Sequence, residues 1–226
     1  MARQLSFDLP VIPVLDRDDF FVSPANALAV AMIETPQTWP GGKLVLSGPT
    51  GSGKTHLAHV WTDQTGATIV AAADLPDRDI PELAQGPVAV EDVPEIADDP
   101  AAQTALFHLH NLVLAGGHRL LLTGQKPPNL WALSLPDLQS RIDGAAHVAL
   151  DLPDDGLLAA VLAKLFSDRQ ITPKPDVIPY LLFRMDRSFL EAAAIVDRLD
   201  RASLDQGRTL SRRLAAELLG EPDTTV

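Results

Sequence analysis

The sequence predicts an α/β domain with a five-stranded parallel sheet, followed by a small all-helical subdomain. Up to about residue 150, short apolar runs alternate with stretches of helical spacing, which indicates right-handed crossovers and parallel strands. A glycine-rich segment joins the first apolar run to a helical stretch, and after residue 154 only helical patterns remain. We therefore divide the chain into an extended tail (1–12), an α/β domain (13–152), a helical subdomain (153–220) and a final tail (221–226).

The elements follow from periodicity and from proline and glycine positions. Ser23 and Pro24 look like an N-cap and the first residue of a helix that Pro36 stops. The strands are predicted at 43–47, 67–71, 87–90, 119–123 and 146–150. The helices are predicted at 24–34, 56–64, 81–85 and 103–115, and then at 155–169, 175–184, 186–205 and 211–219.

Composition and charge limit the function classes. Hydrophobic residues make up 46% of the 226 residues, enough for a real core, and the absence of cysteine excludes disulfides and zinc–thiolate sites. The sequence has no signal segment and no apolar run of membrane-spanning length, so we expect a cytoplasmic protein with no membrane partner. A net charge of −12 argues against non-specific nucleic-acid binding. Residues 74–99 carry nine carboxylates against the single Arg78, which indicates a solvated acidic face or a docking face for a basic partner.

The glycine-rich segment fits the phosphate-binding pattern G-x-x-x-x-G-K-[ST] at every required position. It reads Gly48, Pro49, Thr50, Gly51, Ser52, Gly53, Lys54 and Thr55. In such a loop, backbone N–H groups form a concave anion site at a helix N-terminus. Lys54 is then expected to reach the β- and γ-phosphates, and the Thr55 hydroxyl to ligate Mg²⁺. A glycine-rich turn with a surface lysine is the alternative.

Two carboxylates follow the third predicted strand, where such sites commonly hold the metal-side acid. Asp is more usual at the first of these positions, so Glu91 is a substitution, and its longer side chain can reach Mg²⁺ through water, with Asp92 beside it. A pair of acids facing solvent is the alternative. No carboxylate cluster accompanies the four histidines of the predicted helices to complete a metal site. We therefore interpret them as packing or surface residues: His56, His59, His108 and His110.

Several segments resemble, in order and spacing, the AAA+ ATPase module of the DnaA initiator family. They are residues 48–56, 88–93, 121–128 and 135–141, preceded by Phe21 and Val22, which look like the opening of the DnaA nucleotide site. Residues 199–203 are similar to the lid of the DnaA-related Hda regulators. The resemblance covers nearly the whole chain and implies binding of ADP or ATP with Mg²⁺ by residues 48–56, Phe21 and Val22.

The resemblance also assigns individual roles. Gln125 takes the sensor-1 place, where an amide can bind a γ-phosphate or water but cannot act as a base. Arg141 takes the arginine-finger place, which in AAA+ assemblies points into a neighbouring subunit's site; capping of a helix C-terminus is the alternative. Leu190 falls at the sensor-2 place, with Arg187 one turn earlier as a substitute for the arginine in contacting nucleotide. The expected catalytic set is Glu91, Asp92, Gln125 and Arg141.

The first residues and the last helix bear on partners. Gln4, Leu5 and Phe7 resemble the sliding-clamp-binding peptide of Hda regulators and polymerases, although a disordered tail can also contain two apolar residues. The DNA-binding domain of DnaA has no counterpart after Gly220, so no direct sequence-specific DNA binding is expected.

The resemblance thus implies a regulator of replication initiation that binds the DNA polymerase III sliding clamp and stimulates ATP hydrolysis on DnaA. A free-standing AAA+ ATPase such as a helicase loader is the alternative, and a nucleotide-stabilised scaffold is a third interpretation. The substitutions at Glu91, Gln125 and Leu190 favour the regulator and imply weak intrinsic hydrolysis. The choice between ADP and ATP, and self-assembly into a homo-oligomer, stay open.

Overall fold

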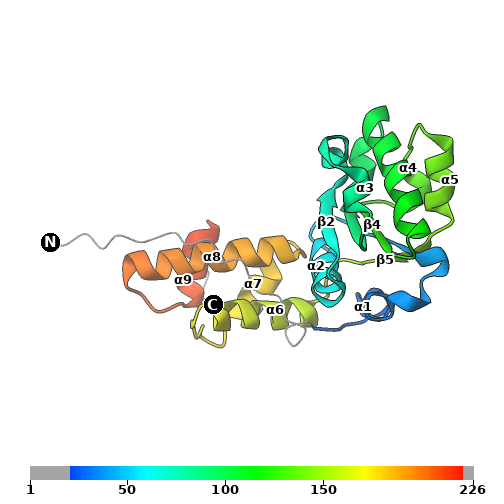
Figure 1. Cartoon of the computed structure of the whole chain (residues 1–226). Helices are drawn as coiled ribbons and strands as arrows, with labels where there is room; N and C mark the ends of the chain where they lie inside the picture. The colour runs from blue at the N-terminus through cyan, green and yellow to red at the C-terminus, as the bar shows by residue number, and fades with distance from the viewer. Residues whose placement is uncertain (1–20, 221–226) are drawn as a thin grey trace.

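The computed structural model describes residues 21–220 and confirms the predicted five-stranded parallel sheet (Figure 1). The predicted tail 1–12 and the tail 221–226 lie outside the described residues. Each strand begins and ends within one residue of its prediction, and the order across the sheet is β2-β3-β4-β1-β5. The strands are β1 (Lys43–Ser47), β2 (Thr68–Ala71), β3 (Val88–Glu91), β4 (Leu120–Gly124) and β5 (Ala146–Ala149).

Strand β4 lies between β3 and β1, and this order decides which loops meet. Ser47 is in register with Gly124, and Val90 with Leu122, so the carboxyl ends of β1, β3 and β4 share one edge of the sheet. The loops that leave these three strands therefore lie close together, and they carry most of the predicted site residues. In parallel sheets, ligands bind at this edge.

Helices cover both faces of the sheet because its strands are apolar on both sides. Leu44 and Leu46 of β1 pack with α1 (Ala27–Glu34) and α2 (Lys54–Thr65), whereas Val45 packs on the opposite face. That second face is covered by α3 (Ile80–Leu83), α4 (Pro100–Ala115) and α5 (Pro136–Asp143). Short 3-10 helices complete the domain at Pro36–Thr38, Pro40–Gly42, Ala72–Asp77, Val93–Ile96 and Pro128–Leu130.

Three helices of this domain, α1, α4 and α5, differ most from the prediction. The predicted N-cap at Ser23 is wrong: Pro24 lies in a turn, and α1 begins at Ala27 after the buried Asn26. Helix α4 begins three residues early because Asp99 caps it, accepting hydrogen bonds from the N–H groups of residues 101 and 102. Helix α5 is absent from the prediction because its buried residues are a single i, i+4 pair, Leu138 and Ile142, in an otherwise polar segment.

The helical subdomain has its own core. It comprises α6 (Asp155–Asp168), α7 (Val177–Arg184), α8 (Phe189–Gln206) and α9 (Arg212–Leu219). Their apolar faces enclose a cluster of fully buried side chains that includes Leu162, Phe166, Leu181, Ile195 and Leu199. The N-caps Asp154, Ser188 and Ser211 begin α6, α8 and α9.

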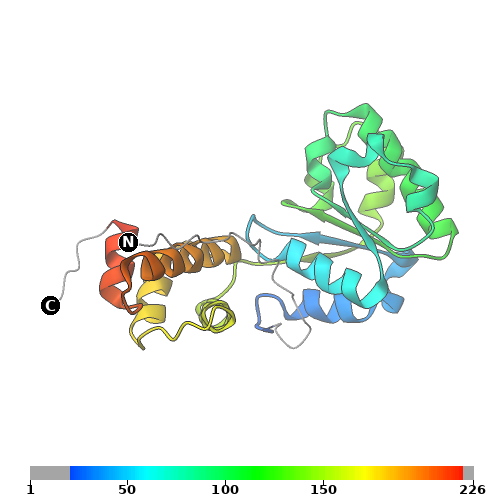
Figure 2. The same cartoon turned by 60° about the vertical axis from the view of Figure 1, so that its left-hand side comes forward.

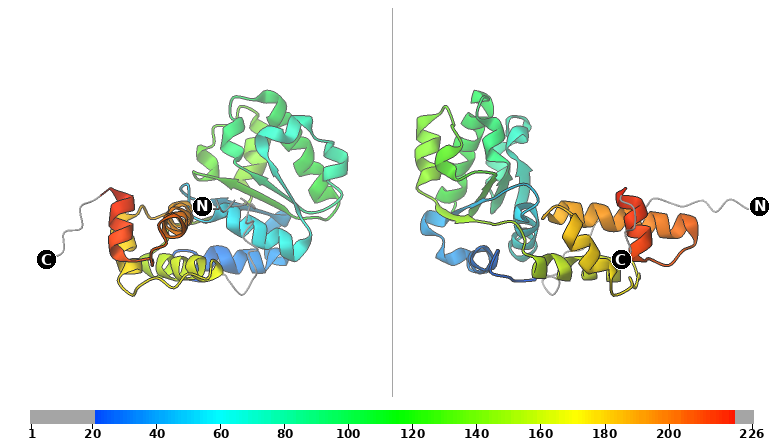
Figure 3. Two further views of the ribbon diagram at one scale, coloured as in Figure 1. Left: turned by 90° about the vertical axis from the view of Figure 1, so that its left-hand side faces the viewer. Right: turned by 180° about the vertical axis from the view of Figure 1, so that it is seen from behind.

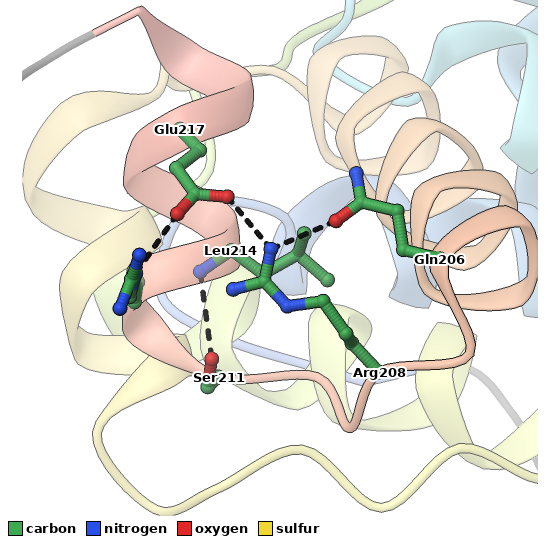
Figure 4. A network of polar contacts seen from close by, with 6 residues as sticks. Gln206, Arg208, Ser211, Leu214 and Glu217 are labelled. Carbon is green, nitrogen blue, oxygen red and sulfur yellow. Dashed lines mark hydrogen bonds and ion pairs between the residues drawn. The ribbon is translucent and has the colours of Figure 1, made fainter.

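A polar network fixes the loop between α8 and α9 (Figure 4). Arg208 donates to Gln206 at 2.8 Å and to Glu217 at 2.9 Å, and Arg213 contacts the other carboxylate oxygen of Glu217 at 2.9 Å. These two guanidinium groups lower the pKa of Glu217. The network lies at the surface, so we assign it the small stabilisation of exposed ion pairs.

The helical subdomain extends from one side of the α/β domain, and the start of α8 points at the loop between β1 and α2 (Figures 2 and 3). The chain passes between the two parts after β5, just before Asp154. Among residues 21–220, no helix combines the length and the apolar character that crossing a membrane requires.

Candidate nucleotide-binding site

The loop between β1 and α2 has a backbone that requires glycine at two positions. Gly51 has φ 78° and Gly53 has φ 98°, both in the left-handed region that other residues adopt only at a cost. Gly53 is the residue directly before α2, so the loop turns sharply into the N-terminus of that helix. The N–H groups of the first turn of α2 are consequently available to an anion.

Lys54 lies at the centre of this loop and is only 8% exposed. Its Nζ donates to the carbonyl oxygens of Gly48 at 2.8 Å and Pro49 at 2.9 Å. Burial lowers the pKa of Lys54, and the nearby carboxylates of Asp92 and Glu91 act in the opposite direction. Because the two carboxylates do not fully offset the effect of burial, a further anionic group beside this ammonium is favoured.

Two buried oxygens near Lys54 have no hydrogen-bond partner among residues 21–220. They are Oγ of Ser52, a residue 3% exposed, and Oε1 of Glu91. A buried hydroxyl or carboxylate oxygen without a partner costs free energy, and a ligand, an ion or a water molecule that binds it removes that cost. The Ser52 hydroxyl suits a phosphate oxygen, and the Glu91 carboxylate suits Mg²⁺ or its water. With Thr55 exposed in the first turn of α2, the residues present fit a magnesium–phosphate group.

Asp92 follows β3 in a strained conformation, with φ 54° and ψ 43°. Its N–H donates to Thr123 Oγ1 on β4 at 3.1 Å, which fixes the tip of β3 against the neighbouring strand. Left-handed backbone at a non-glycine residue costs about 1–2 kcal/mol and occurs preferentially at functional sites. The sequence offers no glycine or asparagine here to signal this conformation.

Gln125 follows β4 and shares a pocket of about 310 Å³ with Asp92. The remaining lining residues are Pro94, Glu95, Lys126, Leu130 and Trp131. The structure therefore brings Glu91, Asp92 and Gln125 to the sheet edge that carries the phosphate-binding loop. The pocket itself is not predictable from the sequence, because it depends on the 3-10 helices after β3 and β4.

Phe21 and Val22 are exposed at the start of the described chain. The hydrogen bonds of this segment run to Asn26, whose side chain donates to the Phe21 carbonyl at 2.9 Å and accepts from the Ser23 N–H at 2.8 Å. The Ser23 side chain in turn bonds to Asp154, the N-cap of α6. The segment thus joins the α/β domain to the beginning of the helical subdomain.

The start of α8 lies directly on the phosphate-binding loop. The Phe189 N–H donates to the Gly51 carbonyl at 3.1 Å, and a Cβ placed on Gly51 would be 2.0 Å from Ser188 Oγ. Arg187, expected to contact nucleotide, instead pairs with Asp155 at 2.8 Å, and both side chains are more than half exposed. Sequence reasoning places Leu190 at this position and misses Ser188 and Phe189. The only signal for this contact in the sequence is Ser188, a residue type that commonly caps a helix N-terminus.

Arg141 lies at the opposite edge of the sheet. Its backbone carbonyl accepts a hydrogen bond from Nζ of Lys43, the first residue of β1, and its guanidinium lies 5.0 Å from the Phe107 ring centroid. Burial, followed by Arg141, lowers the pKa of Lys43. The phosphate-binding loop follows the other end of β1, roughly 13 Å away at about 3.3 Å per residue. The fold therefore does not bring Arg141 to Lys54.

Residues 21–220 contain no group of three or more His, Cys, Asp or Glu side chains arranged to hold an ion. His110 is 3% exposed, with Nε2 3.4 Å from Lys43 Nζ. His56 is partly buried in the first turn of α2, and burial lowers its pKa.

No family model matches the sequence. Among solved structures, domain III of the Thermotoga maritima replication initiation protein DnaA is similar, with a TM-score of 0.78 and 19% identity over 94% of this chain and 98% of that one. AMPPCP-bound DnaA from Aquifex aeolicus gives a TM-score of 0.68 and 19% identity over 84% of this chain and 66% of that one. A variant of Thermotoga maritima RuvB gives a TM-score of 0.67 and 16% identity over 88% of this chain and 70% of that one. The chain therefore has the AAA+ fold of DnaA domain III.

Proposed function

We propose that this chain is an Hda-type AAA+ regulator of chromosomal replication initiation. It binds ADP or ATP with Mg²⁺ at residues 48–55, attaches to the sliding clamp of DNA polymerase III through Gln4, Leu5 and Phe7, and stimulates ATP hydrolysis on DnaA. Its own hydrolysis is weak, because Glu91, Gln125 and Leu190 stand where the DnaA module has other residues.

The geometry around Lys54 supports nucleotide binding. The loop has a phosphate-binding shape and carries the buried Lys54 ammonium and the Ser52 hydroxyl. Among residues 21–220, neither this hydroxyl nor Oε1 of Glu91 has a hydrogen-bond partner. The Aquifex aeolicus DnaA structure, which shares the fold, contains AMPPCP, an adenine nucleotide analogue. The same ligand class suits this chain.

The position of Arg141 is the observation that carries the regulatory role. Arg141 is an exposed residue whose backbone carbonyl bonds to Lys43 at the start of β1, while the phosphate-binding loop follows the Ser47 end. An arginine that acts on a phosphoryl group from this position acts on a nucleotide held by another protein. An AAA+ partner such as DnaA presents that nucleotide.

A free-standing ATPase such as a helicase loader is the second candidate. It is favoured by the placement of Asp92 and Gln125 beside the phosphate-binding loop, where they could orient water for the chain's own nucleotide. Turnover by the purified chain, without DnaA or clamp, separates the candidates. Rapid multiple turnover supports the ATPase, and a rate near background supports the regulator.

The direct test is single-turnover hydrolysis of labelled ATP on DnaA, with clamp loaded on DNA. The unaltered chain should accelerate hydrolysis, and the Leu5→Ala/Phe7→Ala variant should lose both clamp binding and acceleration. Its affinity for ADP should stay unchanged, which controls for folding. Acceleration that does not require clamp would reject the docking peptide, and no acceleration by the unaltered chain would reject the regulatory role.

A further inference from the structure

Three basic residues from three different elements meet beside the Lys43 end of β1. Helices α4 and α5 pack against each other here (Figure 1), with His110 on α4 and Arg141 on α5. Nζ of Lys43 lies 3.4 Å from Nε2 of His110 and donates to the backbone carbonyl of Arg141. Lys43 is partly buried, and His110 is 3% exposed. The Lys43 ammonium therefore joins α4 to the last turn of α5.

The hydrogen bonds of His110 indicate which ring nitrogen accepts. Nδ1 lies 3.3 Å from Oδ1 of Asn111, an oxygen that only accepts, so we assign the ring hydrogen to Nδ1. Nε2 of the neutral ring is then an acceptor for the Lys43 ammonium. With its three N–H groups, the ammonium can donate to this ring and to the Arg141 carbonyl at the same time. The neutral form of His110 therefore holds Lys43 in place.

Arg141 is held at its backbone by Lys43 and at its side chain by Phe107. Its carbonyl lies in the last turn of α5, where carbonyl groups have no partner within the helix and a cation is favourable. Its guanidinium lies over the Phe107 ring, 5.0 Å from the centroid, and Phe107 precedes His110 by three residues on α4. These two contacts define the direction in which the exposed Arg141 side chain leaves α5.

The charged groups that act on His110 in the described part of the chain are both cations. Burial is the main cause that lowers the pKa of His110, Asn111 opposes it, and Lys43 and Arg141 lower the pKa further. The other charged or titratable residues of α4, α5 and the start of β4 are not among these causes: His108, Arg119, Asp137 and Asp143. Protonation would place an N–H on Nε2, facing the Lys43 ammonium, and the two cations would repel each other.

We propose that Lys43 and His110 are positioning residues for Arg141, so that this arginine is aligned for its partner while His110 is neutral. The inference rests on the action of Arg141 on DnaA-bound nucleotide proposed above. Neutral His110 holds Lys43, and Lys43 holds the Arg141 carbonyl. At lower pH, protonated His110 displaces Lys43, the last turn of α5 is released, and Arg141 loses its alignment.

The functional test is single-turnover hydrolysis of labelled ATP on DnaA, with the full chain and with clamp loaded on DNA. Lys43→Met keeps the apolar stem and removes the ammonium. It should lower stimulation by up to about a hundredfold, the effect of misplacing a group by about 1 Å. Lys164→Met, at a lysine of α6 paired with Asp168, is the matched control and should stimulate like the unaltered chain. Full stimulation by Lys43→Met would overturn the role of Lys43.

The pH profile tests His110. His110→Gln keeps an oxygen acceptor for Lys43 but takes up no proton. Stimulation by the unaltered chain, divided by that of His110→Gln, should be constant above about pH 7 and fall below about pH 6.5, because titration of DnaA cancels in this ratio. His118→Gln removes a histidine that does not act on His110 and should follow the unaltered chain. A ratio independent of pH would overturn the role of His110.

An NMR titration of the full chain tests the arrangement without DnaA. The Cε1–H signal of His110 and the Nε–H signal of Arg141 are identified by their loss in His110→Gln and Arg141→Ala. The Arg141 signal should shift with the midpoint of the His110 titration, and this shift should be absent in His110→Gln. An Arg141 signal that does not follow His110 would overturn the inference. A shared midpoint in a chain that does not stimulate hydrolysis on DnaA would instead reject the regulatory function proposed above.

Discussion

Lys54 and Arg141 lie beside opposite ends of β1, and the fold buries one of these cations and exposes the other. At the Ser47 end, Lys54 is 8% exposed and its ammonium is enclosed by loop carbonyls. At the Lys43 end, Arg141 is exposed, and its guanidinium rests on Phe107. Under the proposed function, Lys54 serves a nucleotide that the chain itself encloses, whereas Arg141 is available to a nucleotide held by another protein. The predictions below test this division.

The largest effect is expected at the Lys43 end. Arg141→Ala should lower stimulation of DnaA-bound ATP hydrolysis by about 10³–10⁵-fold, the contribution of an arginine supplied in trans. Lysine should restore little, because it lacks the planar fork that contacts two oxygens together. Single-turnover hydrolysis on DnaA with loaded clamp measures this. Arg201→Ala, a surface arginine paired with Asp197, is the control. Near-normal stimulation by Arg141→Ala would leave Arg141 as a structural residue.

The next effect belongs to the Ser47 end. With ADP at about a hundred times its dissociation constant, the unaltered chain should gain roughly 2.7 kcal/mol in its free energy of unfolding. Lys54→Ala should gain nothing, because the charge that meets the phosphates is removed. Unfolding with and without ADP measures the difference, and Lys164→Ala on α6 should respond like the unaltered chain. An equal ADP response in Lys54→Ala would contradict the assignment.

Strain at Asp92 gives a smaller effect at the same end. Asp92→Gly should raise the free energy of unfolding by up to about 1 kcal/mol, because glycine adopts φ 54° without strain. Nucleotide affinity in the presence of Mg²⁺ should fall in this variant. Gln170→Gly, at φ 58° between α6 and α7, should gain stability without any change in affinity. A loss of stability in Asp92→Gly would show that the carboxylate is held by stronger interactions than its backbone strain.

The smallest effect concerns pH at the Lys43 end. Burial is the main cause that lowers the pKa of His110; Lys43 and Arg141 lower it further, and Asn111 opposes them. The unfolded chain therefore binds a proton near pH 6.5 that the folded chain rejects, so stability falls as pH drops below that value. His110→Gln should lose less stability between about pH 7 and pH 5. The free energy of unfolding of both proteins is measured by urea denaturation at several pH values. An equal fall with decreasing pH in the two proteins would contradict this interpretation.

The sequence was sufficient for the sheet because its inner strands β1, β3 and β4 are short, mainly apolar runs, buried on both faces and bounded by turn residues. The phosphate-binding loop was equally readable, since its glycines and lysine stand at fixed spacing. The position of Arg141 was not, because it depends on the order of strands across the sheet and on the packing of the short helix α5. The contact of Ser188 and Phe189 with Gly51 and Gly53 depends on how the two subdomains dock. Local pattern does not contain that information.

The position of β1 inside the sheet has a consequence for synthesis of the chain. Leu44 pairs with Leu121 on one side and with Ala146 on the other, so β1 gains both neighbours only after β5 has emerged from the ribosome. At about 5–20 residues per second, the phosphate-binding loop waits several seconds on an unsupported strand. Such distant pairings also fold slowly, because loop closure precedes the stabilising contacts. The nucleotide proposed above would then bind the newly completed domain and stabilise it, which would raise the yield of folded protein as well as affect its activity.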